Sequence, residues 1–229
     1  MILCIETATS LCSVALCDGS TVVSLRESND SKSHASMLTV FIDELLKEAR
    51  IKPAELEAVA VSKGPGSYTG LRIGISAAKG ISFGASVPLI GIETITSMFH
   101  GFIRSEIEYN ASRLYCPMLD ARRMEVYYAV YDSTGYQVKE ISADIMNENS
   151  FSSFPEEKEI VLFGEGAKKL KDVIKKDNII FNDDFRISAS HLCFPAHKAF
   201  NAGKFENVAY FEPLYLKDFI ITKQKKNIL

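Results

Sequence analysis

The sequence predicts an α/β protein in which helices flank a mixed sheet. Three observations support this fold class: short apolar runs typical of buried strands, an Asp18-Gly19 turn between two β-rich runs, and an apolar stripe at helical spacing that follows them. In chain order these features give β-β-β-α-β-α-β-α over the first half. A hairpin followed by alternating strands and helices requires both antiparallel and parallel strand neighbours.

The first half contains the clearest elements. Residues 33–50 have a helical apolar stripe, with Ser31 or Ser33 as the expected cap and Pro53 as the stop. The other expected elements are strands at 2–5, 13–17, 21–25, 56–61 and 88–92, and helices at 67–83 and 93–103.

The second half repeats the pattern more weakly, after a polar stretch at residues 104–112 where we place the domain break. No low-complexity linker occurs, so we expect the two halves to pack closely. The expected elements are strands at 114–119, 126–131, 137–141, 160–163 and 179–181, helices at 167–176 and 188–202, and an extended segment at 211–216. We expect the helix at 188–202 to be kinked or interrupted at Pro195.

Composition excludes several classes of protein. The chain has 229 residues, a net charge of −3 and a pI of about 5.9, so it lacks the basic excess of a protein that grips nucleic acid alone. The N-terminus has no basic region and reads as a core strand, while Arg72, Lys79 and Pro88 interrupt the most apolar stretch, so we expect no signal peptide and no membrane span. We therefore expect a cytoplasmic protein.

The five cysteines are Cys4, Cys12, Cys17, Cys116 and Cys193. Their number is odd, no CxxC pair occurs, and three of them lie in strand-like apolar runs. We interpret them as small buried hydrophobic residues in a reducing compartment, rather than as metal or redox sites.

The glycine-rich segment KGPGSYTGLRIG, residues 63–74, fits neither common phosphate-binding motif. Its glycines are one residue too far apart for a Walker A loop, and Leu71-Arg72 stands where that loop needs Lys-Ser/Thr; the spacing also fails GxGxxG. Instead Gly66, Gly70, Gly74 and Ala78 recur every four residues and would form a ridge on a helix. Glycine in a helix costs up to about 1 kcal/mol, so we expect another backbone close to this ridge, from the chain's own sheet or from a partner.

Catalytic side chains are scarce. His34 is followed one turn later by Leu38, so a second metal ligand is missing, and we expect His34 to be exposed or to act as a cap. His100, His191 and His197 are scattered, no GxSxG motif occurs, and Ser67 stands at a helix start as a cap. Asp120, Arg122, Arg123 and Glu125 form a charged cluster, which is either a solvated turn or a contact with a partner, the domain cleft or tRNA.

Four segments together resemble the TsaB (YeaZ) family: ILCIETATSLCSVAL, SKGPGSYTGLRIG, DARRMEVYYAVY and EPLYLKD. The resemblance is strong over residues 1–131 and weaker over 132–210. It implies two actin-like (ribonuclease-H-like) domains, one at residues 1–106 and a smaller one at 107–210, with residues 211–229 packing back on the first. Relatives commonly have Asp where this chain has Glu6, so a standard nucleotide geometry is not expected here.

The resemblance also implies a role without catalysis. Family members bind the larger paralogue TsaD, which transfers a threonylcarbamoyl group to the tRNA adenosine beside the anticodon, and the ATPase TsaE joins them. This implies no cofactor of the chain's own, with ATP and metal on the partner subunits, tRNA bound only within the complex, and self-association when the chain is alone.

The helices at 33–50 and 67–83 form the paralogue interface in that family. The candidate residues for helix packing or partner binding are therefore Leu38, Phe41, Ile42, Leu45, Gly66, Tyr68, Gly70, Leu71, Arg72, Gly74, Ile75 and Ala78. Candidate polar contacts with the cleft or a partner are Glu6, Thr7, Asp120, Arg122, Arg123 and Glu125. We expect Arg72 to pair with a carboxylate, either inside its domain or across an interface. The alternative functions are an actin-like ATPase or kinase, and a metallopeptidase.

Overall fold

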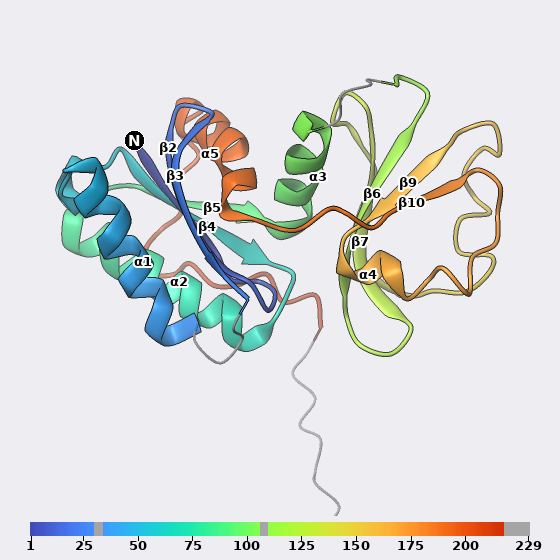
Figure 1. Cartoon of the computed structure of the whole chain (residues 1–229), viewed down its shortest axis with the longest axis horizontal. Helices are drawn as coiled ribbons and strands as arrows, with labels where there is room; N and C mark the ends of the chain where they lie inside the picture. Colours follow the sequence, from blue (N-terminus) through green and yellow to red (C-terminus); the bar gives the residue numbers. More distant parts are fainter. Residues whose placement is uncertain (30–33, 106–109, 218–229) are drawn as a thin grey trace, which may run out of the picture.

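A computed structural model describes residues 1–29, 34–105 and 110–217 and contains two five-stranded sheets (Figure 1). The expected caps Ser31 and Ser33 and part of the expected domain break lie outside the described residues. The first-sheet strands are β1 (Ile2–Glu6), β2 (Cys12–Asp18), β3 (Thr21–Ser28), β4 (Ala58–Gly64) and β5 (Leu89–Glu93). The second-sheet strands are β6 (Leu114–Asp120), β7 (Glu125–Asp132), β8 (Gln137–Ile145), β9 (Ile160–Phe163) and β10 (Ile179–Asn182).

The two sheets have the same topology. The first has the strand order β3-β2-β1-β4-β5, in which β1–β2 and β2–β3 are antiparallel and β1–β4 and β4–β5 are parallel. The second has the order β8-β7-β6-β9-β10, with antiparallel and parallel pairs in the corresponding places. The weak repeat seen in the sequence is therefore a structural repeat, and β6 occupies the place of β1.

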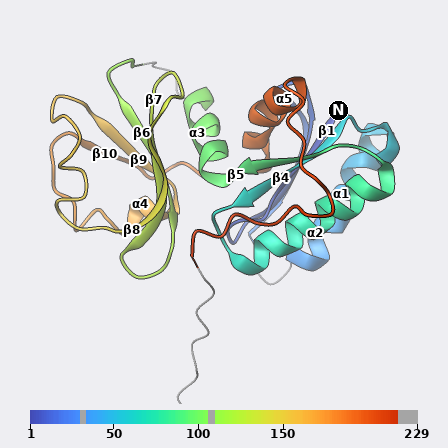
Figure 2. The same cartoon turned by 180° about the vertical axis from the view of Figure 1, so that it is seen from behind.

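Helices cover both faces of the first sheet. Leu3 and Ile5 of β1 pack toward α1 (His34–Ala49) and α2 (Tyr68–Ala85), whereas Ile2 and Cys4 pack toward η2 (Ala189–Leu192) and α5 (Cys193–Asn201). This alternation follows from the two-residue period of a strand. Figure 2 shows α1 and α2 together on one side and α5 on the other. The short η1 (Pro53–Glu55) connects α1 to β4.

Helix α3 (Thr94–Ser105) lies between the two sheets (Figure 1). Its buried residues Met98, Phe99 and Phe102 belong to the core formed with β6, β7 and β9. The Phe102 ring stacks on Phe163 of β9, with 4.1 Å between centroids. The opposite face of the second sheet packs against α4 (Glu165–Lys168) and the turns that follow it. The close packing expected between the halves therefore occurs through α3.

The C-terminal half differs from the expected division of the chain. Residues 189–201, which the sequence assigned to the second domain, pack on the first sheet through apolar side chains such as Leu192 and Ala196. The expected interruption falls at Cys193, where η2 gives way to α5, and not at Pro195. Pro195 lies in the first turn of α5, where its missing N–H leaves no helical hydrogen bond unmade.

The helix expected at 167–176 is shorter than its apolar stripe suggests. Only Glu165–Lys168 is α-helical, and successive turns follow, as in the Leu170 N–H to Ala167 carbonyl bond of 3.0 Å. Leu170 and Ile174 are still buried, so the stripe correctly marked the residues that enter the core. Lys169 bonds Asp120 and the Glu125 carbonyl on the neighbouring hairpin, and these contacts fix the segment without a continuous helix.

All five cysteines are buried, as expected, but two of them are paired. Cys17 of β2 and Cys193 of α5 form a disulfide across 176 residues of sequence, and Cys4 Sγ lies 3.6 Å from Cys17 Sγ. The expectation of unpaired thiols was therefore wrong. A pairing over this sequence separation cannot be read from local pattern, because only the packing of α5 on the first sheet brings the two residues together.

Alkylation in denaturant without reductant should modify Cys4, Cys12 and Cys116 alone, giving three adducts by intact mass. Prior reduction should give five, and in the chain-entropy model it should lower the free energy of unfolding by about 5 kcal/mol. Five adducts without reductant would contradict the Cys17–Cys193 bond.

Candidate functional site

The loop after β1 encloses the carboxyl group of Glu6, which is fully buried. Its Oε1 accepts hydrogen bonds from the Ala8 N–H at 2.6 Å and from Ser62 Oγ at 2.8 Å. Its Oε2 has no hydrogen-bond partner within the described residues. Burial raises the pKa of Glu6 to about 7, against the lowering effect of these hydrogen bonds. The side chain is thus used within its own loop and is closed off from solvent.

The glycine ridge of α2 packs against the residues that follow Glu6. A Cβ at Gly70 would lie 2.0 Å from the Thr7 carbonyl oxygen, and one at Gly74 would lie 2.2 Å from Thr7 Oγ1. A Cβ at Gly66 would lie 2.5 Å from the Ala8 oxygen. Thr7 Oγ1 donates to the Gly70 carbonyl at 2.8 Å. The ridge therefore packs within its own domain, against the loop after β1 and the end of that strand.

The start of α2 is fixed by Ser67, as expected. Its Oγ accepts from the Gly70 N–H at 3.3 Å, and its own N–H donates to the Ala8 carbonyl at 2.6 Å. These bonds tie the helix start to the loop after β1.

The residues expected at a helix-packing or partner interface fall into a buried group and a solvent-exposed group. Those buried in the core of their own domain are Leu38, Phe41, Ile42, Leu45, Gly70, Leu71, Gly74, Ile75 and Ala78. They serve helix packing, and their side chains are not accessible to a partner. Only Gly66, Tyr68 and Arg72 keep appreciable exposure. The helical periodicity correctly predicted which residues are buried. A partner, however, would bind the opposite, solvent-facing side of the helices.

The outward face of α2 carries residues that were not among the interface residues predicted from the sequence. Ser76, Gly80, Phe83 and Gly84 are exposed and share one side of the helix. A Cβ at Gly80 or Gly84 would have no neighbour within 4 Å in the described part of the chain, and Phe83 is 81% exposed. The sequence does contain a pattern that could have indicated this face: Gly80 and Gly84 are four residues apart, as Gly66, Gly70 and Gly74 are.

Within the described residues Arg72 contacts aromatic rings, and no carboxylate of its own domain pairs with it there; pairing across an interface stays a prediction. Its Nε donates to Tyr215 Oη at 3.1 Å, and its guanidinium lies 4.1 Å from the centroid of the Tyr68 ring. Tyr68 and Tyr215 stack with 5.0 Å between centroids. Because Tyr215 arrives from the far end of the sequence, local pattern could not identify this cluster.

The C-terminal segment, residues 205–217, packs back on the first domain, as expected for its described part (Figure 2). Phe211 enters the core beside α2, and the Leu214 N–H donates to the Lys63 carbonyl at 2.7 Å. Lys217 then forms an ion pair with Glu125 on the second sheet. The segment therefore connects the two domains by a second path besides α3.

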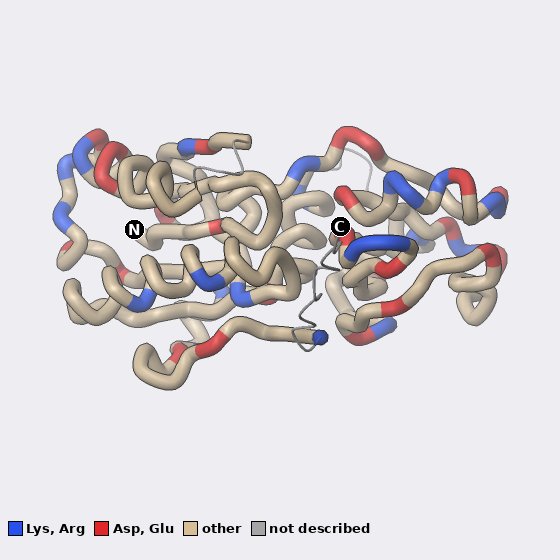
Figure 3. Tube along the Cα trace, turned by 90° about the horizontal axis from the view of Figure 1, so that it is seen from below, with Lys and Arg blue, Asp and Glu red and all other residues tan. Residues whose placement is uncertain are grey.

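The charged cluster at residues 120–125 forms the turn between β6 and β7. Asp120 accepts from the Arg122 N–H at 2.7 Å and from Lys169 Nζ at 2.6 Å. Arg122 and Arg123 have left-handed backbone angles, with φ of 73° and 49°. The turn with local ion pairs is thus observed, while contact with tRNA stays a prediction. Figure 3 shows acidic and basic residues interspersed over both halves of the molecule.

The structural repeat relates this turn to the Glu6 loop. Glu6 ends β1 and Asp120 ends the corresponding β6. A Gly-x-Gly turn follows the fourth strand of each sheet, and a Cβ at Gly166 would lie 2.7 Å from the Leu119 carbonyl oxygen, as one at Gly66 would meet Ala8. The sequence reading missed Gly164 and Gly166, although the segment FGEG contains the same spacing.

The histidines do not assemble as metal ligands. His34 is buried on the apolar face of α1, contrary to the expected exposed position, because it shares the stripe of Leu38 and Phe41. Among the described residues, the one group of three or more side chains of metal-ligand type that converge is Cys4, Cys17 and Cys193. None of the described helices combines the length and apolar character needed to cross a membrane.

Similarity to known proteins agrees with this architecture. The family model of TsaD, tRNA N6-adenosine threonylcarbamoyltransferase, matches residues 27–220. The chain is 31% identical over 229 residues to the tRNA threonylcarbamoyladenosine biosynthesis protein TsaB of Escherichia coli (strain K12), covering 97% of each protein. The chain belongs to the TsaB family.

Solved structures support the fold. A Pseudomonas aeruginosa protein described as similar to peptidase YeaZ superposes with a TM-score of 0.82 at 21% identity, covering 94% of this chain and 99% of that one. A polyphosphate/ATP-glucomannokinase from Arthrobacter sp. strain KM gives a TM-score of 0.50 at 11% identity, covering 88% and 98%. The expected actin-like α/β fold with two mixed sheets is confirmed, and the family is one of tRNA threonylcarbamoyladenosine biosynthesis proteins.

Gly70→Ala should lower the free energy of unfolding by roughly 1–3 kcal/mol, because its methyl group would overlap the Thr7 carbonyl. The matched change Gly80→Ala should raise it by about 0.5–1 kcal/mol, because the site is open and alanine favours the helix. Urea unfolding measures both, and equal effects would contradict the assignment of buried and open glycine faces.

Glu6→Gln tests the buried carboxyl group. Since the folded pKa is raised to about 7 from an ordinary value near 4.5, its contribution to stability is present below about pH 4.5 and is lost as pH rises through 7. The stability of the wild type relative to Glu6→Gln should therefore fall by roughly 3 kcal/mol across this range. A difference independent of pH in denaturant titrations would exclude this protonation.

Proposed function

We propose that this chain is a non-catalytic subunit that binds and stabilises TsaD during threonylcarbamoylation of the tRNA adenosine next to the anticodon. The observation that carries the proposal is the outward face of α2. Gly80 and Gly84 each cost the isolated helix up to about 1 kcal/mol, yet an added Cβ at either would meet no atom of the described residues within 4 Å, and Phe83 beside them is 81% exposed. Such a surface suits the close approach of a partner backbone around one aromatic anchor.

The neighbouring helix extends this surface. α1 and α2 lie side by side on the first sheet (Figure 2), and α1 presents Val40 at 45% exposure. Their inward faces are committed to the core, so partner binding at these helices would use the outward residues. The same surface suits self-association when the chain is alone.

The loop chemistry supports a role without catalysis. Both oxygens of Glu6 are enclosed, and Leu38 stands one helical turn from His34, where a second imidazole would be needed to hold a metal ion. We therefore place ATP and metal on the partner subunits, TsaD and TsaE. The chain itself would meet tRNA only within the cytoplasmic complex.

Phe83→Glu should weaken binding to TsaD at least tenfold, because it introduces a charge at the centre of the proposed interface. The matched control is Tyr136→Glu, which changes a ring that is 70% exposed on the other domain. The readouts are co-elution with TsaD in size-exclusion chromatography and tRNA modification with TsaD, TsaE and the threonylcarbamoyl-adenylate synthase. The unfolding free energy of both variants should stay near that of the wild type.

Two outcomes would overturn the proposal. One is the failure of the wild-type chain to co-elute with TsaD, even with TsaE and ATP. The other is tRNA modification that proceeds equally well without this chain. Micromolar binding of Mg-ATP by the lone chain in calorimetry would instead favour the ATPase alternative.

A further inference from the structure

A recess lies on the side of the first sheet away from α1 and α2. It has a volume of about 410 Å³ and is bounded by the β2–β3 turn, α3, and the η2–α5 segment. This size is within the range of small-metabolite sites. We call it the α3–α5 pocket.

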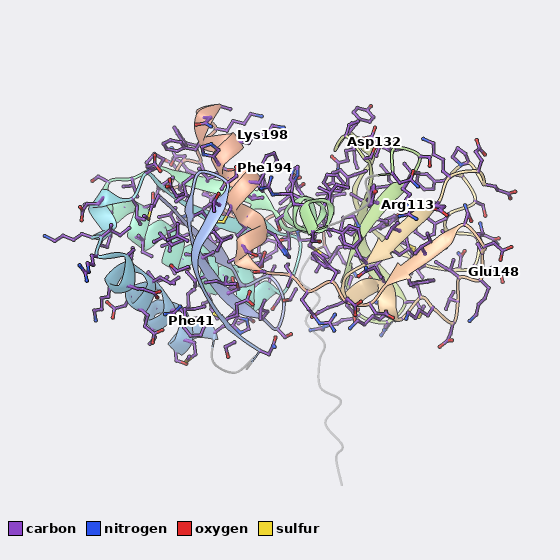
Figure 4. All side chains as sticks on the ribbon, turned by 45° about the horizontal axis from the view of Figure 1, so that its top comes forward. Phe41, Arg113, Asp132, Glu148, Phe194 and Lys198 are labelled. Carbon is purple, nitrogen blue, oxygen red and sulfur yellow. A yellow bond between two sulfur atoms is a disulfide. The ribbon has the colours of Figure 1, made fainter. Side chains whose placement is uncertain are left out.

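One wall of the α3–α5 pocket is built from α3. His100 and Arg104 are four residues apart and therefore share a face of the helix. Both contact the Phe194 ring of α5: the Arg104 guanidinium carbon lies 5.1 Å from its centroid, and the centroid of the His100 ring lies 5.0 Å away. Figure 4 shows Phe194 and Lys198 on α5 beside α3.

The opposite wall carries His191, whose position depends on Gly101. A Cβ at Gly101 would lie 2.2 Å from the His191 ring, so only glycine lets the imidazole pack on α3 there. The ring also stacks on Phe185 at 5.1 Å. Within the described part of the chain its Nδ1 is enclosed without a hydrogen-bond partner. The Nε2–H tautomer leaves a donor free for a ligand.

The described residues that line this pocket are basic, neutral polar or apolar. Within the described residues its lining contains no Asp or Glu, while it contains Arg104, two imidazoles, and the hydroxyl groups of Ser20, Thr21, Ser105 and Ser190. No carboxylate of the described residues lies within ion-pair distance of Arg104. Burial lowers the pKa of His100 and of His191 to about 4, so both rings are neutral donors near pH 7.

We propose that the α3–α5 pocket binds the phosphate group of a small metabolite, with Arg104 and His191 as its principal donors. A guanidinium beside an imidazole and the hydroxyl groups of Ser20 and Thr21 matches the several acceptor oxygens of a phosphate. The hydroxyl groups of Ser105 and Ser190 already donate to the Phe102 carbonyl and to Ser188 Oγ, so they line the pocket without donating to the ligand. The face of Phe194 would pack against the remainder of the molecule. The site does not involve the α1–α2 surface, so a test of phosphate binding is independent of a test of TsaD binding.

Inorganic phosphate is the probe, titrated into the isolated full chain at constant ionic strength with chloride as the reference. The readout is the imidazole C–H signals of the four histidines in heteronuclear NMR. We expect saturable shifts of the His100 and His191 signals in the millimolar range. Arg104→Gln should weaken binding about tenfold, equivalent to about 1.4 kcal/mol. His191→Phe, which keeps a ring over Gly101, should weaken it similarly.

The matched control is Lys175→Gln, which removes one positive charge from an exposed side chain on the second domain and should leave phosphate binding unchanged. Circular dichroism establishes that each variant is folded. The proposal is overturned if the shifts do not saturate, if chloride reproduces them, or if Arg104→Gln and His191→Phe bind phosphate as the wild type does.

Discussion

The close approach between α2 and the loop after β1 is the constraint on which the first domain depends. Gly66 and Gly70 let backbone meet backbone there, Gly74 makes room for the Thr7 side chain, and the Thr7 hydroxyl donates directly to the helix. A helix held this tightly cannot roll, because any rotation would drive a side chain into the Thr7–Ala8 backbone. Its orientation therefore decides which residues enter the core and which remain on the outside.

Two consequences follow from that orientation. Glu6 is sealed beneath the loop, so an acidic residue at the end of a first strand serves local structure. Gly80, Phe83 and Gly84 are turned outward on the distal half of the helix, where nothing in the described chain covers them. One close contact thus both encloses the acidic group and presents the surface we propose for TsaD.

The second domain repeats the plan of the first with smaller parts. Asp120 and the Gly164–Gly166 turn stand in the places of Glu6 and the Gly64–Gly66 turn, but α4 is four residues long where α2 has eighteen. The two domains are connected by α3 and also by the C-terminal segment, whose Lys217 forms an ion pair with Glu125. The α3–α5 pocket lies where the returning chain packs against α3, so it exists because residues 189–201 rejoin the first domain.

The sequence alone determined the strand and helix order, the hairpin at Asp18-Gly19, the buried stripe of α1 and the family. These depend on local periodicity and turn chemistry, which neighbouring residues specify. Only the tertiary structure decided that His34 is buried, that Arg72 meets Tyr215, that Cys17 pairs with Cys193, and that the open glycines are Gly80 and Gly84. The Arg72 and Cys17 contacts join segments distant in sequence, so no local pattern specifies them. Spacing places His34 on the stripe of α1 and pairs Gly80 with Gly84, but only the packing of the helices decides which side is covered.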